Sequence, residues 1–347
     1  MMNVKARPLS AKAFEQAKAK WDRVAKPLGS LGRFEDMINR VAAIQGTADV
    51  ELKPRCALVF CADHGVVAQG VSQCGSEVTS LVARSVARGE SNINILADCA
   101  DTRVFAVDMG IKCPPDEDKL ISLRHGDGTR DFSLKPAMGR SEAEAALDDG
   151  IRLVGKLADQ GYRLFVTGEM GIGNTTATAA LACALLGLKP EEAVCRGSGL
   201  SNEGLKRKAD VVEKALSLHA PKADDPIGAL TAVGGFEIAG MAGAFLGAAE
   251  RGVPIVIDGV ISAVSALIAQ RICPEAKNYM LPSHMSASRA MGPIMEELVL
   301  KPVIDGGMAL GEGTGAVMLL PLLDMAKRLY DSAHSFDSLG MEPYKAL

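Results

Sequence analysis

The stretch Leu58-Val59-Phe60-Cys61-Ala62-Asp63-His64-Gly65 is a short apolar run that ends in two polar residues and a glycine. Similar apolar runs, each followed by a polar residue, recur at 104–107, 164–167, 255–257 and 280–281, with helical stretches between them. Continuous apolar runs of this length are typical of strands that are buried on both faces of a parallel sheet. The pattern therefore predicts an α/β fold in which helices flank a parallel sheet.

Each of these runs ends at a polar side chain that could carry chemistry, and the five are Asp63, Asp108, Glu169, Asp258 and His284. The carboxyl ends of parallel strands meet at one edge of the sheet, and ligands of α/β proteins bind just beyond that edge. We therefore expect the five side chains to gather there.

Helical patterns before and after the strands predict a smaller lobe. Residues 10–28 read as an amphipathic helix that Ser10 can cap, with one apolar face made of Phe14, Ala17, Trp21 and Val24. A turn at 26–33 leads to a second predicted helix at 34–44, and the tail from 319 to 330 is helical again. We expect this tail to rejoin the N-terminal helices.

These patterns divide the chain into three parts. We expect an N-terminal helical segment at 1–50, an α/β catalytic domain at 51–318 and a C-terminal helical segment at 319–347, with the first and last forming the small lobe. The polar, turn-rich segment at 112–140 is expected to be a surface excursion.

The composition excludes several classes of function. A net charge of −4 without a basic stripe argues against nucleic acid as the main partner. No apolar window is long enough to cross a membrane, and the N-terminus lacks the apolar core of a signal peptide, so we expect a cytoplasmic protein. The eight cysteines form no C-x-x-C pair and the histidines lack metal-ligand spacing, so we expect no disulfide framework and no metal site.

The stretch Met308-Ala309-Leu310-Gly311-Glu312-Gly313-Thr314-Gly315-Ala316 sets one carboxylate between glycines in an apolar segment. Burial raises the pKa of a carboxyl group toward the range in which it can accept a proton near neutrality. Glu312 is therefore the first candidate for a general base. The alternative is a turn carboxylate that sits at a helix N-terminus and is stabilised by the helix dipole.

A second glycine-rich stretch, Thr167-Gly168-Glu169-Met170-Gly171-Ile172-Gly173-Asn174-Thr175-Thr176, joins a predicted strand to an Ala-rich helix. Glycines let backbone amides approach a phosphate closely, and the start of a helix favours an anion. The residues predicted to hold the phosphate are Gly171, Ile172, Gly173, Asn174, Thr175 and Thr176. No Walker A lysine follows, and a plain strand-to-helix turn capped by threonine is the alternative.

A third turn, Arg196-Gly197-Ser198-Gly199-Leu200, leads into a helix whose start is expected to contain Lys206-Arg207-Lys208. Cations at a helix start oppose the dipole, so Lys208 is a candidate to meet an anionic ligand. A solvated basic face is the alternative. The small residues spaced along 234–244 favour close helix packing over a site.

Nine motifs fall in order over nearly the whole chain: KPLGSLGR (26–33), CADHGV (61–66), PAMGRSEAEAAL (136–147), GEMGIGNTTATAA (168–180), RGSGLSNEGLKRK (196–208), VGGFEIAGMAGA (233–244), IDGVISAVSAL (257–267), PSHMSAS (282–288) and ALGEGTGA (309–316). Together they resemble the nicotinate-nucleotide:dimethylbenzimidazole phosphoribosyltransferase family. A set of this length and order is highly specific.

The resemblance implies transfer of phosphoribose from nicotinate mononucleotide to an aromatic base, with release of nicotinate, to make the lower ligand of a cobamide. It implies a Rossmann-like sheet with a smaller helical lobe, a homodimer and no cofactor. It assigns Glu312 as the base that deprotonates the incoming nucleophile and places Glu169 and Lys208 in the same site. The 171–176 turn and the turn with Gly197, Ser198 and Gly199 would contact the phosphoribosyl group.

One motif departs from the family pattern. Members that use benzimidazole resemble S-P-x-x-V-T-x-x-Q, in which the Ser and the Gln border the pocket for the aromatic base. Here Cys74 and Val82 stand at those two positions, and Leu310 is expected to complete the pocket.

This loss of polar partners favours an alternative acceptor, such as phenol or p-cresol, and an enzyme that works as a heterodimer with a paralogue. A non-catalytic partner subunit and a nucleotide-binding module without catalysis are further alternatives. Retention of Glu312, Glu169 and Lys208 argues against a silent subunit.

Overall fold

The computed structural model describes residues 4–344, and six parallel strands form one sheet within that range. The strands are β1 (Arg55–Ala62), β2 (Arg103–Gly110), β3 (Ile121–Ser122), β4 (Leu164–Met170), β5 (Ile255–Ile257) and β6 (Met280–Pro282). They lie in the order β3-β2-β1-β4-β5-β6, so the chain builds outward from β1 first in one direction and then in the other. The predicted α/β fold and its five apolar strands are confirmed.

The sheet is buried between two layers of helices. Leu58 and Phe60 of β1 belong to the core that includes α5 (Arg140–Asp159) and α10 (Phe236–Arg251). Val59, between them in sequence, faces the opposite core with α3 (Glu77–Arg88), α4 (Asn92–Cys99) and α13 (Thr314–Tyr330). Alternation of side chains along a strand thus supplies both cores, which is why the run is apolar at every position.

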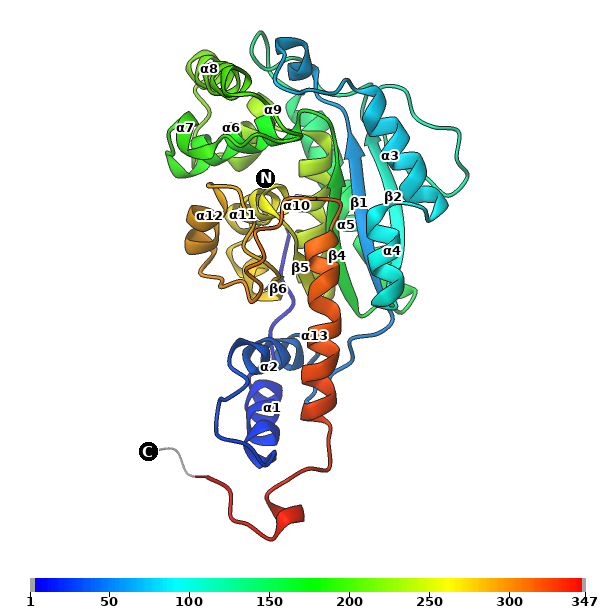
Figure 1. Cartoon of the computed structure of the whole chain (residues 1–347), viewed down its shortest axis with the longest axis vertical. Coiled ribbons are helices and arrows are strands. Elements are labelled where there is room, and N and C mark those ends of the chain that lie inside the picture. Colours follow the sequence, from blue (N-terminus) through cyan, green and yellow to red (C-terminus); the bar gives the residue numbers. More distant parts are fainter. Residues whose placement is uncertain (1–3, 345–347) are drawn as a thin grey trace.

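The remaining helices surround the carboxyl edge and the β5–β6 side of the sheet (Figure 1). They are α6 (Asn174–Leu186), α7 (Pro190–Ala193), α8 (Asn202–His219), α9 (Pro226–Val233), α11 (Val260–Ile272) and α12 (Met291–Leu298). Elsewhere along the chain, short 3₁₀ helices lie at 65–69, 274–279 and 337–339. None of the helices in residues 4–344 is long and apolar enough to cross a membrane.

The small residues along 234–244 serve helix packing, as predicted. A Cβ added to Gly243 of α10 would overlap the carbonyl group of Leu147 in α5, and one added to Gly150 of α5 would overlap the carbonyl of Gly240. Only glycine lets the two backbones come this close.

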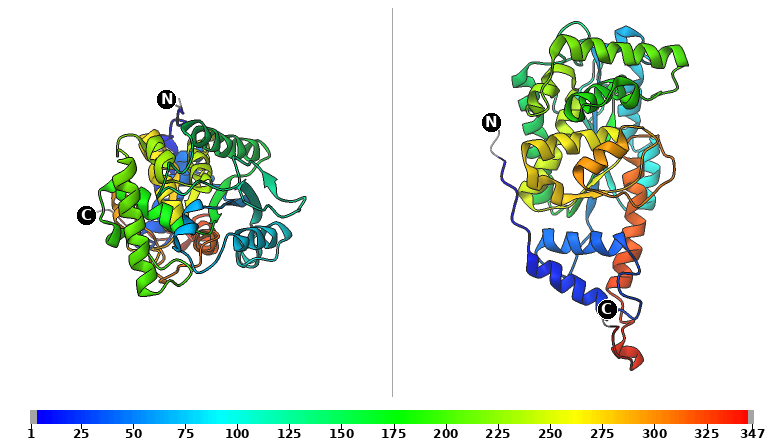
Figure 2. Two further views of the ribbon diagram at one scale, coloured as in Figure 1. Left: turned by 90° about the horizontal axis from the view of Figure 1, so that it is seen from above. Right: turned by 90° about the vertical axis from the view of Figure 1, so that its left-hand side faces the viewer.

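The small lobe contains α1 (Ala11–Arg23), α2 (Arg33–Gln45) and the C-terminal part of α13, which extends from the sheet into the lobe (Figures 1 and 2). The ring centroids of Trp21 and Tyr330 lie 5.0 Å apart, so the N-terminal helix α1 packs against the end of α13. Ser10 caps α1 as expected. The boundary that we placed between residues 318 and 319 falls inside α13, which runs without a break from the sheet to the lobe.

Three details of the predicted elements were wrong. The helix predicted at 10–28 ends at Arg23. Phe14 is 37% exposed instead of lying on the buried face of α1, because that helix packs through Ala13, Ala17 and Trp21. The segment at 112–140 is more than a surface excursion: it contributes the edge strand β3, and Phe132 within it is fully buried.

Candidate functional site

A cavity of about 520 Å³ opens at the carboxyl ends of β4, β5 and β6. Three of the five predicted strand-end residues, Glu169, Asp258 and His284, line this strand-end cavity together with the turn that carries Glu312. The other two, Asp63 and Asp108, lie at the same edge but are not among its lining residues. The strand ends thus mark the site, but only on one side of the sheet.

Glu312 sits in a turn whose backbone is held in the left-handed region, with φ of +85° at Gly311, +62° at Glu312 and +94° at Gly313. Its side chain is buried, and its carboxylate accepts hydrogen bonds from Asn92 Nδ2 at 3.0 Å and from the Ile93 amide at 3.2 Å. Ile93 lies in the first turn of α4, where backbone amides lack partners within the helix. Glu312 therefore lines the cavity and also sits at a helix N-terminus, and its role as a base stays a prediction.

Glycine at position 168 brings this turn against the sheet. A Cβ added to Gly168 of β4 would overlap the carbonyl group of Glu312. The turn can therefore lie directly on the strand that carries Glu169, which brings the two carboxyl groups to one cavity.

Glu169 is buried at the end of β4, where the side-chain amide of Asn174 donates a hydrogen bond to its Oε2. Burial raises the pKa of Glu169 to about 8, and the negative charges of Asp258, Glu237 and Glu312 contribute to the rise. The carboxyl group is therefore mostly protonated at neutral pH. It can serve as a hydrogen-bond donor there, or as a proton acceptor in slightly alkaline solution.

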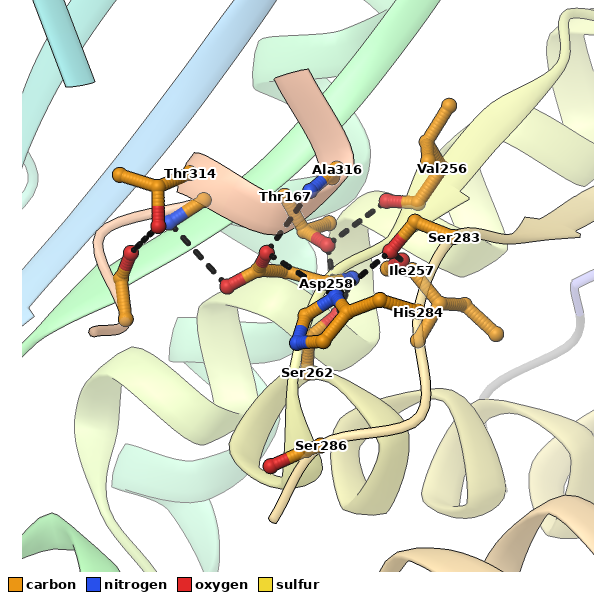
Figure 3. A network of polar contacts seen from close by, with 12 residues as sticks. Thr167, Val256, Ile257, Asp258, Ser262, Ser283, His284, Ser286, Thr314 and Ala316 are labelled. Carbon is orange, nitrogen blue, oxygen red and sulfur yellow. Dashed lines mark hydrogen bonds and ion pairs between the residues drawn. The ribbon is translucent and has the colours of Figure 1, made fainter. Parts of the chain in front are cut away.

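Asp258 follows β5 and joins the network in Figure 3. Its carboxylate accepts the amides of Ala316 at 2.9 Å and Gly313 at 3.2 Å, and burial raises its pKa. His284 lies beside it, with Nδ1 3.9 Å from Asp258 Oδ1 and 3.1 Å from Ser283 Oγ. The sequence placed both residues at the site but assigned a role to neither.

The predicted phosphate cradle joins β4 to α6 as expected, and Gly171, Ile172, Gly173, Asn174 and Thr175 line the cavity. Thr176 lies behind it and is fully buried. The amides of Ile172, Asn174 and Thr176 already donate hydrogen bonds within the protein, to Thr79 Oγ1, the Gly171 carbonyl and the Gly173 carbonyl. An anion in the cradle would therefore depend on the other amides of the turn.

Lys208 was expected at the start of a helix, but α8 begins at Asn202 and has Glu203 in its first turn. Lys208 lies further along the helix and is fully buried, and its Nζ donates to Thr175 Oγ1 at 2.6 Å and to the Cys195 carbonyl at 3.1 Å. It therefore joins the cradle to the third turn from behind, and burial lowers its pKa.

The third turn contributes Arg196, Gly197 and Ser198 to the cavity lining, whereas Gly199 accepts a hydrogen bond from the side chain of Gln73. Of the predicted pocket for the aromatic base, Leu310 lines the cavity and is 56% exposed. Cys74 and Val82 are not among the lining residues, and Val82 packs against the core beneath α3.

Sequence reasoning missed several groups at this site. Asn92 reaches Glu312 from the start of α4, and Ser72 and Ser286 line the cavity. No local signal singles out these residues, although the position of Ser286 in the PSHMSAS motif offered a hint. Among residues 4–344, no group of three or more His, Cys, Asp or Glu side chains is arranged to hold a metal ion.

The chain is similar to known proteins over almost its whole length. Residues 6–341 match the phosphoribosyltransferase family model. The chain is 42% identical to the nicotinate-nucleotide–dimethylbenzimidazole phosphoribosyltransferase of Acetivibrio thermocellus over 93% of this chain and 92% of that protein. It is 41% identical to the enzyme of the same name from Clostridium acetobutylicum, over 98% and 96% of the two chains.

A solved structure is similarly close. The crystal structure of CobT from Thermus thermophilus superimposes with a TM-score of 0.90 at 39% identity, covering 96% of this chain and 100% of that one. Agreement in sequence, fold and length over almost the whole chain leads to one conclusion: this chain belongs to the nicotinate-nucleotide–dimethylbenzimidazole phosphoribosyltransferase family.

Proposed function

We propose that the chain transfers phosphoribose from nicotinate mononucleotide to an aromatic base, 5,6-dimethylbenzimidazole or a close relative, and releases nicotinate. The observation that carries this proposal is the meeting of Glu312, Glu169 and the 171–175 turn in one cavity. A phosphate held at the turn would bring the attached ribose toward the two carboxyl groups. Fixing both reactants in this way supplies much of the rate enhancement in a transfer reaction.

The residues suit the steps of the reaction. The bond between the ribose anomeric carbon and the nicotinate ring nitrogen breaks, and its electron pair leaves with nicotinate. The incoming base forms a bond to the same carbon from the opposite face and gives up its N–H proton to Glu312. Positive charge develops on the ribose during this exchange, and a buried carboxylate near the carbon would stabilise it.

Incubation with nicotinate mononucleotide and a panel of bases tests this function, with products identified by mass. We expect nicotinate and a base ribotide in equal amounts, with dimethylbenzimidazole as a good acceptor. The Glu312→Gln variant is the matched control because it keeps the size of the side chain. Failure of the wild-type protein to release nicotinate with any base would refute the proposal.

The phenol alternative gains no support. The relatives carry dimethylbenzimidazole in their names, and Cys74 and Val82, on which the alternative depended, are not among the cavity-lining residues. Dimethylbenzimidazole is therefore the acceptor that we propose to test first.

We also propose that the protein is a homodimer. Met318, Leu322 and Met325 recur at helical spacing along α13 and remain exposed, the last of them at 67%. Exposed apolar stripes of this kind are typical of protein interfaces, and a second copy is the partner that the family resemblance suggests. A heterodimer with a paralogue and a cytoplasmic location stay predictions from the sequence.

A further inference from the structure

Asp258 holds the first turn of α13 from a distant part of the chain. Its Oδ2 accepts the Gly313 amide at 3.2 Å and its Oδ1 accepts the Ala316 amide at 2.9 Å, across 55 and 58 residues of sequence. Amides at the start of a helix lack partners within it. No side chain of the turn itself caps this helix, since Gly313 occupies the N-cap. The carboxylate at the end of β5 therefore supplies the cap.

This contact fixes the residue next to it. The Gly313 amide belongs to the peptide that begins at the Glu312 carbonyl, so Asp258 orients the backbone on one side of Glu312. Glu312 has a φ of +62°, a conformation that L residues avoid and that persists only where the surroundings impose it. On the other side, its carboxylate is held by Asn92 and Ile93 of α4.

His284 completes the support from β6. Its ring lies against Gly315, where any Cβ would overlap it, and its Nδ1 is 3.9 Å from Asp258 Oδ1. Both side chains are buried. A protonated imidazole beside a buried carboxylate favours the charged form of that carboxylate, against the effect of burial, and the charged form is the better acceptor for two amides. The PSHMSAS and ALGEGTGA motifs therefore interlock through Asp258.

We propose that Asp258 is a positioning residue that holds Glu312 in the geometry required for proton transfer, without itself acting on the substrate. The inference rests on the proposed function, because it names what keeps the proposed base in place. Because Asp258 acts through Glu312, its removal should lower turnover more than it weakens binding of nicotinate mononucleotide.

A double-mutant cycle between Asp258→Asn and Glu312→Gln tests this. We expect Asp258→Asn alone to lower kcat by roughly 10- to 100-fold and to change the KM for nicotinate mononucleotide by less than about threefold. In the Glu312→Gln background the same substitution should lower kcat by less than about threefold, because groups that act as a unit are not additive. Multiplicative losses, or a normal kcat in Asp258→Asn, would overturn the proposal.

Asp108→Asn is the matched control. Asp108 Oδ1 also accepts two backbone amides, from Gly110 at 2.9 Å and Ile111 at 2.7 Å, but both lie within three residues of it in the chain. This variant should keep the wild-type kcat once differences in folded fraction are corrected. An equal fall in kcat for both variants would mean that Asp258 acts only through stability, which also overturns the proposal.

Amide hydrogen exchange provides a readout that needs no turnover. In Asp258→Asn we expect faster exchange at Gly313 and Ala316, by roughly tenfold or more, and also at Ile93, which Glu312 holds. Unchanged exchange at Ile93 would contradict the link to Glu312. If the wild-type protein releases no nicotinate, the proposed function fails while this readout still decides the positioning role. Asp258→Ser, which keeps a hydroxyl acceptor, takes the place of Asp258→Asn if the amide variant does not fold.

Discussion

The two sides of the carboxyl edge of the sheet begin from the same sequence pattern but differ in what their carboxyl groups contact. On the β1–β2 side, Asp108 accepts amides at the end of its own strand, from Gly110 and Ile111, and Arg124 Nη1 lies 3.0 Å from its other oxygen. On the β4–β6 side, Glu169 and Asp258 face a cavity.

The difference shows that an acidic residue after a buried strand does not by itself mark a site. Asp63 Oδ2 accepts the Lys112 amide at 2.8 Å, from the segment that leads toward β3. The two carboxyl groups on the β1–β2 side therefore hold neighbouring backbone, and neither lines the strand-end cavity. On the β4–β6 side, Asp258 reaches across to the turn before α13, and the space between these elements stays open.

The largest effect should come from Glu312→Gln. The amide keeps the size of the side chain but cannot take the proton, so we expect turnover to fall by roughly two to four orders of magnitude with the fold intact. Asp108→Asn, on the β1–β2 side of the sheet edge, should instead lower the free energy of unfolding by about 1–3 kcal/mol and leave turnover per folded molecule unchanged. Steady-state kinetics with urea denaturation separates the two. Normal turnover in folded Glu312→Gln would remove Glu312 from the mechanism.

The cradle is tested by Gly173→Val. Gly173 has a φ of +99°, and a Cβ there would lie 2.9 Å from the Cβ of His64, so the turn must shift. We expect the affinity for nicotinate mononucleotide to fall by roughly tenfold or more, while the affinity for the aromatic base changes little.

The control for the cradle lies at the other end of the same helix. Gly187, which follows α6, also has a positive φ, +70°, but nothing lies within 4 Å of a Cβ placed there. Gly187→Val should therefore introduce similar backbone strain without affecting either ligand. Calorimetry with the two ligands measured separately gives the comparison, and equal losses for both ligands in Gly173→Val would indicate a folding defect instead.

The raised pKa of Glu169, on the cavity side, predicts how the free energy of unfolding depends on pH. Its pKa is about 8 in the folded protein and near 4.5 when exposed, so the folded state binds the proton more tightly. Below about pH 4.5 Glu169 is protonated in both the folded and the unfolded protein, and its contribution to the free energy of unfolding is fully present. As the pH rises from 4.5 toward 8, the unfolded protein loses this proton first, so the free energy of unfolding falls by at most a few kcal/mol. Glu169→Gln should remove this loss and stabilise the protein at pH 8. Urea denaturation at pH 5 and pH 8 tests it, and equal pH dependence in both proteins would contradict the assignment.

The smallest effect on the fold should come from Met325→Lys on the exposed stripe of α13. A single surface substitution changes the free energy of unfolding by about 0.5 kcal/mol or less. If the stripe forms the dimer interface, however, the variant should shift toward the monomer in sedimentation experiments. Lys327→Glu on the same helix, away from the stripe, is the control. A dimer unaffected by Met325→Lys would place the interface elsewhere.

The sequence by itself determined five of the six strands, the small lobe and the turns that carry Glu312 and the cradle. These features depend on apolar periodicity and on glycine positions within windows of ten to twenty residues, so the local sequence is enough to predict them. Tertiary structure alone decided which strand-end carboxyl groups face a cavity, why Lys208 is buried behind the cradle and why Phe14 remains exposed. It also brought Asp258 to the amides at 313 and 316. Such partners are separated by many residues, and only the order of the strands and the packing of the loops bring them together.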